Sequence, residues 1–369
     1  MPPRAPQPLT QKEIATAKAV LTEFETISWV KLDILGLLAG GYFNRNYLIG
    51  NSTPTFVLRR YDLNKDPATI EYEHELLRAL PAELHTASIA KPLRNGRGET
   101  IVTFEGKHYS LFHFLAGHRP QLSRTSLFPE AGYILAAYHN AVRRYTPTPR
   151  QRQGYGTVQC LDWVAAHAGG LDKLWPLINS LPVRDAREQL IRDSLNFLEE
   201  ECVIIQSILL DKVYDSIPQL VIHNDVGPQN ILCIEDRIVA LLDFDLVAWD
   251  ARAYDLATTL MWFSEDSDLQ APFALLPGDR RWILNLKRSQ ALFHAYCSDL
   301  EEGLTPAEID LLPTFMRAFG LWLAIWYLDL RVGRLEWYPE EISGLIPFLR
   351  WFRNNAQFYV TAMVNDAST

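Results

Sequence analysis

The spacing of apolar residues changes along the chain and divides it into three parts. Residues 1–30 hold a Pro-rich start and then apolar positions three and four residues apart, which predicts a tail and one helix capped by Thr10. Residues 31–114 carry short apolar runs separated by turn residues, which predicts strands. Residues 115–369 return to helical spacing almost throughout. The pattern therefore predicts a small antiparallel sheet followed by a larger helical part.

One helix interrupts the predicted sheet, in the stretch DPATIEYEHELLRALP. Asp66 has the side chain of an N-cap residue, Pro67 suits the first helical position, and Pro81 stands just beyond the end. The first unit of the fold is therefore expected to be a sheet that carries one helix.

The stretch VIHNDVGPQNILCIEDRIVALLDFD, residues 221–245, interrupts the helical part. Two short apolar runs on either side of EDR predict an antiparallel hairpin, which would bring Asp243 next to Asn230, with Asp225 in the same loop. Carboxylate and amide oxygens together form the hard ligand set that Mg²⁺ prefers. The alternative is an ordinary polar hairpin end, in which Asn and Asp cap turns.

Composition narrows the range of partners. With 48% apolar and 21% charged residues, the chain can bury a sizeable core. A formal net charge of −9 disfavours nucleic acid, whose phosphates require a basic surface. The apolar run Gly320–Leu328 is too short to cross a bilayer, the first residues lack a signal-peptide pattern, and the scattered cysteines fit neither a zinc site nor a disulfide framework. We expect a cytoplasmic protein without a nucleic-acid or membrane partner.

The motif HNDVGPQN followed by LLDFD resembles the catalytic loop and metal-binding segment of the aminoglycoside phosphotransferase and choline/homoserine kinase superfamily. That resemblance implies a bilobal, protein-kinase-like α+β fold, with a small antiparallel-sheet lobe over 31–114 and a larger, mostly helical lobe over 115–369. In the family the loop begins His-Gly-Asp, whereas this chain has Asn224 in place of the glycine.

The resemblance also implies roles for the polar residues of this stretch. Asp225 corresponds to the catalytic base that accepts the proton of the substrate hydroxyl, and Asn230 and Asp243 correspond to the Mg²⁺ ligands. His223 and Asp255 correspond to residues that brace the loop. Whether Asp245 adds a contact to the metal is left open.

The predicted sheet lobe carries further matches to the family, which imply a nucleotide site. LLAGGYFNRNYLIG resembles the glycine-rich loop over the phosphates, and Arg59 on the third strand replaces the more usual Lys. Val57 and Arg59 share one face of that strand, with Arg60 on the other. The alternative for Arg59 is an exposed strand residue. The residues implied in nucleotide binding are Gly41, Asn44, Asn46, Arg59, its helix partner Glu73, and, in the segment connecting the two lobes, His113 and Leu115.

The expected function is therefore that of a small-molecule kinase using ATP and Mg²⁺. Only residues 246–254 separate DFD from DLA, which leaves no room for an activation loop that docks a peptide, so a small hydroxyl acceptor is favoured. Homoserine-, choline-, sugar- and aminoglycoside-like acceptors stay open, as do the oligomeric state and the choice between ATP and GTP. Late aromatic residues fit either a core or a cation-binding cage; they are Trp322, Trp326, Tyr327, Trp337 and Tyr338. The alternative function is a kinase-fold protein that binds nucleotide or a partner without turnover.

Overall fold

The computed structural model describes residues 9–24, 31–38, 44–61, 66–150, 152, 171–209, 213–332 and 339–365. The chain divides into two compact units: Met1–His118 together with Val239–Asp245, and Arg119–Ile238 together with Leu246–Thr369. The first unit is built around a sheet, and the second is mostly helical. The expected α+β fold with two lobes is confirmed.

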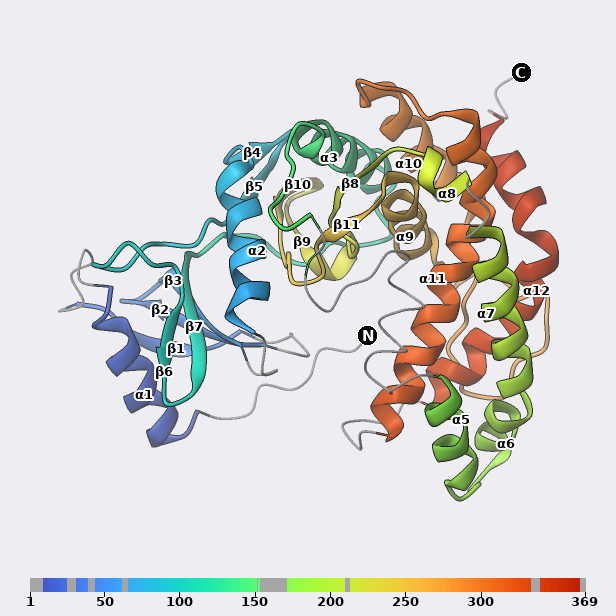
Figure 1. Cartoon of the computed structure of the whole chain (residues 1–369), viewed down its shortest axis with the longest axis horizontal. Coiled ribbons are helices and arrows are strands. Elements are labelled where there is room, and N and C mark those ends of the chain that lie inside the picture. The colour runs from blue at the N-terminus through green and yellow to red at the C-terminus, as the bar shows by residue number, and fades with distance from the viewer. Residues whose placement is uncertain are drawn as a thin grey trace. The chain divides into compact units, whose positions relative to one another are not determined.

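The first unit contains a five-stranded antiparallel sheet with the strand order β1-β2-β3-β7-β6 (Figure 1). Its strands are β1 (Asp33–Leu37), β2 (Asn44–Gly50), β3 (Pro54–Tyr61), β6 (Val102–Phe104) and β7 (Lys107–His113). In the central pair β2–β3, Asn46 lies opposite Arg59 and Leu48 opposite Val57. Because side chains alternate across a strand, this register also decides which charged residues share a face.

Helix α1 (Gln11–Leu21) covers one face of this sheet. Thr10 and Glu13 form a capping box at its start, as the sequence predicts. One apolar core joins the helix to the sheet; its members include Val20, Leu21, Phe24, Tyr47, Ile49, Phe56, Leu58 and Leu111. On the same face, Arg60 lies 3.7 Å from Glu13. Helix α1 therefore packs against the sheet of the first unit.

Helix α2 (Pro67–Ala79) supplies contacts to the opposite face. Asp66 caps it by accepting a hydrogen bond from the Ala68 N–H, and Pro67 is its first residue, so the predicted start is confirmed. Glu73 of this helix reaches Arg59 of β3, which points away from α1. The sheet thus separates two neighbouring arginines: Arg59 points toward α2, and Arg60 points toward α1.

A later segment of the chain returns to the first unit. Strand β10 (Arg237–Leu241) pairs in parallel with β5 (Ala87–Ile89), which in turn pairs with β4 (Glu83–Leu84). Leu241 lies opposite Ile89, and both side chains are buried. This pairing fixes the strand that leads directly into Asp243 and Asp245.

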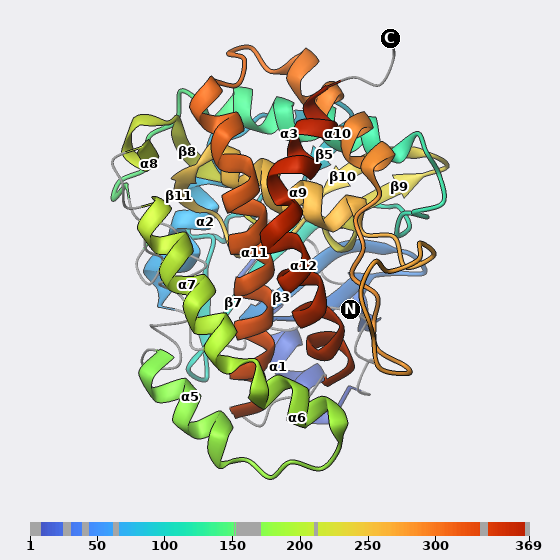
Figure 2. The ribbon, with the colours of Figure 1, turned by 90° about the vertical axis from the view of Figure 1, so that its right-hand side faces the viewer.

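The second unit is built mainly from helices, of which α7, α11 and α12 run side by side (Figure 2). Its described elements are α3 (Leu127–Val142), α5 (Leu171–Ser180), α6 (Ala186–Asp193), α7 (Leu195–Leu209), α8 (Val213–Ser216), β8 (Gln219–Ile222), η1 (Pro228–Asn230), β9 (Ile231–Ile234), β11 (Ala248–Ala251), α9 (Arg252–Ser264), α10 (Leu286–Asp299), α11 (Pro306–Val332) and α12 (Pro339–Val364). Helices α3 and α10 approach closely at Gly132, where an added Cβ would lie 2.3 Å from the Leu292 carbonyl oxygen.

Helix α11 contains a segment that meets the length and composition of a membrane span. Residues 306–329 have a mean hydropathy of 1.3 in their most apolar window, and 89% of that window is buried inside the protein. Three of the late aromatic residues lie in this helix: Trp326 and Tyr327 are buried, and Trp322 is half-buried. Such burial is typical of a core helix. Trp337 and Tyr338 lie outside the described residues.

Candidate active site

The segment that carries Asp225 starts at strand β8 and leads back to strand β11, and these two strands pair with each other. Strands β8 and β11 pair in antiparallel fashion, with Ile222 opposite Ala248. The loop therefore leaves β8 at His223, and the chain returns to β11 at residue 248. Both strands are almost wholly buried, so the ladder gives the loop a rigid base.

Asp255, in the first turn of α9, holds the backbone at the start of this loop. Its carboxylate accepts hydrogen bonds from the N–H groups of His223 at 2.8 Å and Asn224 at 2.7 Å. The Nε2 atom of His139 lies 3.1 Å from the same carboxylate, and all of these groups are buried or half-buried. Burial lowers the pKa of His139 in spite of this neighbouring carboxylate and so favours the neutral imidazole, which can donate a hydrogen bond from Nε2–H to Asp255.

Asn224 adopts a left-handed backbone conformation, with φ of 68°. Glycine adopts such a conformation without a steric cost, and Asn tolerates it better than most other residues. The Asn224 side chain also donates a hydrogen bond to the Leu246 carbonyl at 3.4 Å. The structure thus gives a physical reason why Asn can stand where the resemblance leads one to expect glycine.

Among the described residues, three side chains donate hydrogen bonds to the carboxylate of Asp225. Asn230 Nδ2 donates to Oδ2 at 2.6 Å, while Gln229 Nε2 and Trp262 Nε1 donate to Oδ1 at 2.9 and 3.1 Å. Gly227 leaves room for this arrangement, because a Cβ there would lie 2.5 Å from the Gln229 amide. The predicted base is therefore held in one orientation.

The sequence alone does not predict the hydrogen bonds that Gln229 and Trp262 donate to Asp225. Gln229 lies between two residues that the motif singles out, and Trp262 follows Asp255 by two helical turns. Residues seven apart share one face of a helix, so that spacing was the available signal. It predicts the face of the helix but not the hydrogen bond.

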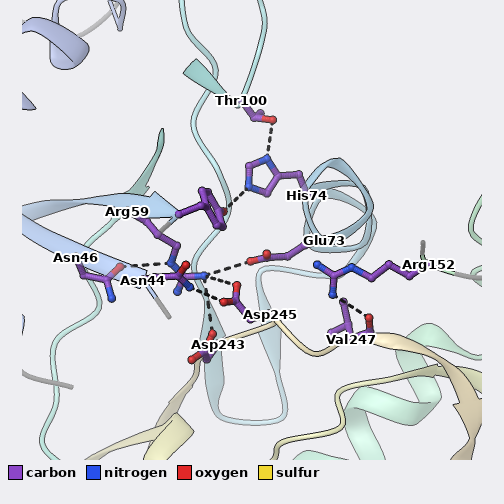
Figure 3. A network of polar contacts seen from close by, with 11 residues as sticks. Asn44, Asn46, Arg59, Glu73, His74, Thr100, Arg152, Asp243, Asp245 and Val247 are labelled. Atoms are coloured by element: carbon purple, nitrogen blue, oxygen red, sulfur yellow. Dashed lines mark hydrogen bonds and ion pairs between the residues drawn. The ribbon is translucent and has the colours of Figure 1, made fainter. Parts of the chain in front are cut away.

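In the first unit, Arg59 lies among three carboxylates (Figure 3). Its Nη1 atom is 3.3 Å from Glu73, 3.3 Å from Asp245 and 3.9 Å from Asp243. Burial alone lowers the pKa of Arg59, but the charges of Asp245, Asp243 and Glu73 outweigh burial and raise it above its usual value. The guanidinium is therefore permanently charged.

The two asparagines predicted in the nucleotide loop also meet this cluster. Asn46 accepts a hydrogen bond from Arg59 Nε at 3.4 Å, and Asn44 donates one to Asp245 Oδ2 (Figure 3). Gly41 lies outside the described residues. The structure thus places the Arg59 side chain between its strand neighbour Asn46 and the helix residue Glu73.

The two residues predicted in the connecting segment lie at the end of β7 and just beyond it. His113 is the last residue of β7, is exposed, and has its ring 5.3 Å from that of Phe56. Leu115 is half-buried beyond the strand. Their proposed backbone contacts to adenine remain a prediction.

The predicted site residues thus fall into two groups. The first unit holds Asn44, Asn46, Arg59, Glu73 and Asp243, and the second unit holds Asp225 and Asn230.

The ligands expected for Mg²⁺ have the right chemistry. Asp243 has a left-handed backbone, with φ of 60°, and its side chain is 38% exposed. Asn230 uses Nδ2 as a donor to Asp225, so its Oδ1 is the atom that can meet a cation. Within the described residues no three His, Cys, Asp or Glu side chains form a metal cluster. A magnesium ion held by one or two protein oxygens, with water and substrate phosphates, needs no such cluster.

Three comparisons with known proteins place these features in context. Residues 35–292 of this chain match the sequence profile of the phosphotransferase enzyme family. A homoserine kinase of Granulibacter bethesdensis is 25% identical over 288 residues, which cover 78% of this chain and 78% of that protein.

Two solved structures are similar in fold. A microcompartment-associated aminopropanol kinase has a TM-score of 0.62 and 19% identity, covering 95% of this chain and 98% of its own. An aminoglycoside phosphotransferase of Alicyclobacillus acidocaldarius has a TM-score of 0.58 and 15% identity, covering 98% and 97%. At these identities the structural similarity shows the fold alone, and it confirms the expected kinase-like fold.

Proposed function

Because the chain belongs to the phosphotransferase enzyme family, we propose that it is a small-molecule kinase, which transfers the γ-phosphoryl group of ATP to a hydroxyl group of its acceptor. The observation that carries this proposal is the arrangement at Asp225, whose carboxylate is oriented by three N–H donors in a loop braced by Asp255. A turn-capping aspartate would not need three side-chain partners from a loop and a helix.

In this proposal Asp225 acts as the general base. It accepts the proton of the acceptor hydroxyl as the oxygen attacks the γ-phosphorus and the bond from that phosphorus to the ADP oxygen breaks. The donors Asn230, Gln229 and Trp262 keep the carboxylate in one orientation, which reduces the cost of positioning it at the moment of transfer.

Arg59 and Glu73 are proposed to serve the nucleotide phosphates. A guanidinium presents several N–H donors in a fixed plane and suits phosphate oxygens. The ion pair with Glu73 holds the guanidinium on the face of β3 that points away from α1. Asn230 and Asp243 would hold the magnesium ion, which neutralises phosphate charge when bound.

The acceptor is proposed to be a small hydroxylated amino acid of the homoserine kind. This choice rests on the relative named as a homoserine kinase, which covers 78% of the chain. Choline and aminoglycosides are other acceptors to compare, because structural neighbours carry such names. Sugars complete the panel.

A coupled ADP assay with these acceptors tests the proposal. We expect ADP to accumulate only with ATP, Mg²⁺ and a hydroxylated acceptor, and homoserine to be among the best acceptors. Asp225→Asn keeps the shape of the side chain but removes the base, so turnover should fall by about 10² to 10⁴-fold while Mg²⁺-ATP still binds.

The alternative, a protein that binds nucleotide or a partner without turnover, makes the opposite prediction. A thermal shift with ATP would then appear in the absence of any ADP formation across the acceptor panel, and Asp225→Asn would change nothing in either measurement. Competent residues at Asp225, Asn230, Asp243 and Arg59 argue against this alternative.

A further inference from the structure

We propose that Asp245, the second aspartate of the DFD segment, is a positioning residue that anchors Arg59 and Asn44, and that it is not a magnesium ligand. This inference rests on the proposed kinase function for its catalytic consequence. The anchoring itself is a property of the protein without nucleotide, so the two can be tested separately.

Both oxygens of Asp245 already have partners. Oδ1 lies 3.3 Å from Arg59 Nη1, and Oδ2 accepts a hydrogen bond from Asn44 Nδ2 (Figure 3). A carboxylate that bound a metal in addition would have to give up at least one of these bonds. Releasing Arg59 would be costly, because its half-buried guanidinium would lose one of its two nearest carboxylates.

The solvent exposure of Asp243 and Asp245 supports the same assignment. The Asp245 side chain is 8% exposed, whereas that of Asp243 is 38% exposed. A magnesium ion that keeps several of its waters requires an accessible oxygen. Asp243 meets this requirement, and Asp245 lies in the interior beside the guanidinium.

A second carboxylate beside Arg59 restricts the orientation of the guanidinium. Glu73 comes from α2 and Asp245 from the segment after β10, so the guanidinium is held by two separate parts of the first unit. With one carboxylate alone, the Arg59 side chain could turn about that contact. Two carboxylates and Asn46 fix its plane, which is the property that phosphate recognition by arginine depends on.

Asn44 extends the anchor to the start of β2. It is the first residue of that strand and directly follows residues 39–43, which contain the predicted glycine-rich turn. Through Asp245, the start of β2 at Asn44 is tied to the position of Arg59. Asp245 is thus expected to organise the nucleotide-binding face before any ligand arrives.

The test compares Asp245→Asn with Asp243→Asn, using Asp268→Asn, at an exposed aspartate, as the control. An amide offers a single oxygen, so in Asp245→Asn either Arg59 or Asn44 faces an N–H group. We expect the melting temperature of the nucleotide-free protein to drop by several degrees, and ATP affinity measured in EDTA to fall at least tenfold. The Mg²⁺ concentration that half-activates turnover should stay at the wild-type value.

Asp243→Asn should show the reverse pattern: a raised Mg²⁺ requirement, with little change in ATP affinity in EDTA. If Asp245→Asn instead raised the Mg²⁺ requirement and left the metal-free measurements unchanged, Asp245 would be a metal ligand and the proposal would be overturned. If Asp245→Asn does not fold, Asn44→Ala removes one bond only. It should weaken metal-free ATP binding without altering the Mg²⁺ requirement, and an unchanged affinity would count against the anchor.

A failure of the kinase function would look different. Wild-type protein would then form no ADP with any acceptor, while the melting temperature and the metal-free ATP titrations would still report on the anchor. Combining Arg59→Gln with Asp245→Asn provides a further check, since residues in direct contact give non-additive effects. The double variant should lose less stability than the sum of the two single variants, and strict additivity would contradict the contact.

Discussion

The indole Nε1 of Trp262 donates a hydrogen bond to Asp225 Oδ1 at 3.1 Å, which links helix α9 to the proposed catalytic base. The ring also contacts Phe319 at a centroid distance of 5.3 Å and Trp282 at 6.3 Å. An aromatic cluster in the helical unit therefore ends in a polar group that is directed at the carboxylate.

Trp262→Phe should lower turnover by roughly tenfold, because it keeps an aromatic ring but removes one hydrogen bond to a charged group. The KM for ATP should not change, since the residue orients the base and has no proposed contact with nucleotide. Steady-state kinetics with the best acceptor would measure both constants.

Trp282→Phe is the matched control. Trp282 is fully buried in the same cluster, and its indole nitrogen has no hydrogen-bond partner among the described residues. The Trp282→Phe substitution should therefore leave kcat near the wild-type value. Equal losses in the two variants would mean that ring packing, rather than the hydrogen bond, supports turnover.

Arg59→Ala should destabilise the protein by about 3–5 kcal/mol and weaken ATP binding, because Glu73 and Asp245 become buried carboxylates without a cation. Urea unfolding and a nucleotide titration would measure the two effects.

Arg60→Ala serves as the neighbouring comparison. Arg60 contacts Glu13 and the Tyr47 hydroxyl on the α1 face, so its loss should cost about 1 kcal/mol or less and leave ATP affinity intact. Should Arg60→Ala prove the more damaging to ATP binding, the assignment of faces on β3 would be wrong.

Asn224→Ala should reduce the free energy of unfolding by about 1–2 kcal/mol, because a Cβ without a polar partner is disfavoured in the left-handed region. Asn224→Gly should be close to neutral, since glycine adopts this conformation freely. Chemical denaturation of both variants measures the difference. If Asn224→Gly lost as much stability as Asn224→Ala, the Asn224 side chain, and not the backbone conformation, would be the source of the loss.

Because His139 is buried, we expect the stability of the protein to depend on pH. Burial lowers its pKa below the unfolded value of 6.5, so the unfolded chain binds the extra proton first as the pH falls. Its stabilising contribution is thus fully present above about pH 6.5 and is lost below it, by at most about 1.4 kcal/mol per pH unit. The groups that face the ring are Asp255, Tyr296, Arg252 and Glu308.

Free energies of unfolding between pH 5 and 8 would check this, with His139→Gln as the comparison. The glutamine variant should be less stable at pH 8 and should show a shallower slope below pH 6.5. A slope identical to that of the wild-type protein would assign the acid sensitivity to other groups.

Local features of the fold could be predicted from the sequence because each depends on neighbours in the chain. Thr10 with Glu13, and Asp66 with Pro67, encode the starts of α1 and α2 within four residues. The alternation on β3 likewise separates Arg59 from Arg60 without knowledge of the partner strands.

Contacts between distant residues could not be predicted in the same way. Asp245 follows Arg59 by 186 positions, and nothing in DFD distinguishes an anchor from a ligand before burial is known. The clustering of residues 239–245 with the first unit depends on the parallel pairing of β10 with β5, which short apolar runs do not specify. Trp262 was one of many aromatic residues at helical spacing, and only the fold shows that its indole reaches Asp225.

The late arrival of Asp245 has a consequence for how the protein is made. The 186 residues that separate it from Arg59 take the ribosome about 10–40 s to add at 5–20 residues per second. During that interval Glu73 is the carboxylate partner of Arg59 in the nascent N-terminal unit, beside the amide of Asn46, and β5 still lacks its parallel neighbour β10. The charge balance at Arg59 is therefore completed only after much of the helical unit has been translated. Chain breaks or fusions placed between the two segments should affect the yield of folded protein more than their positions on the surface would suggest.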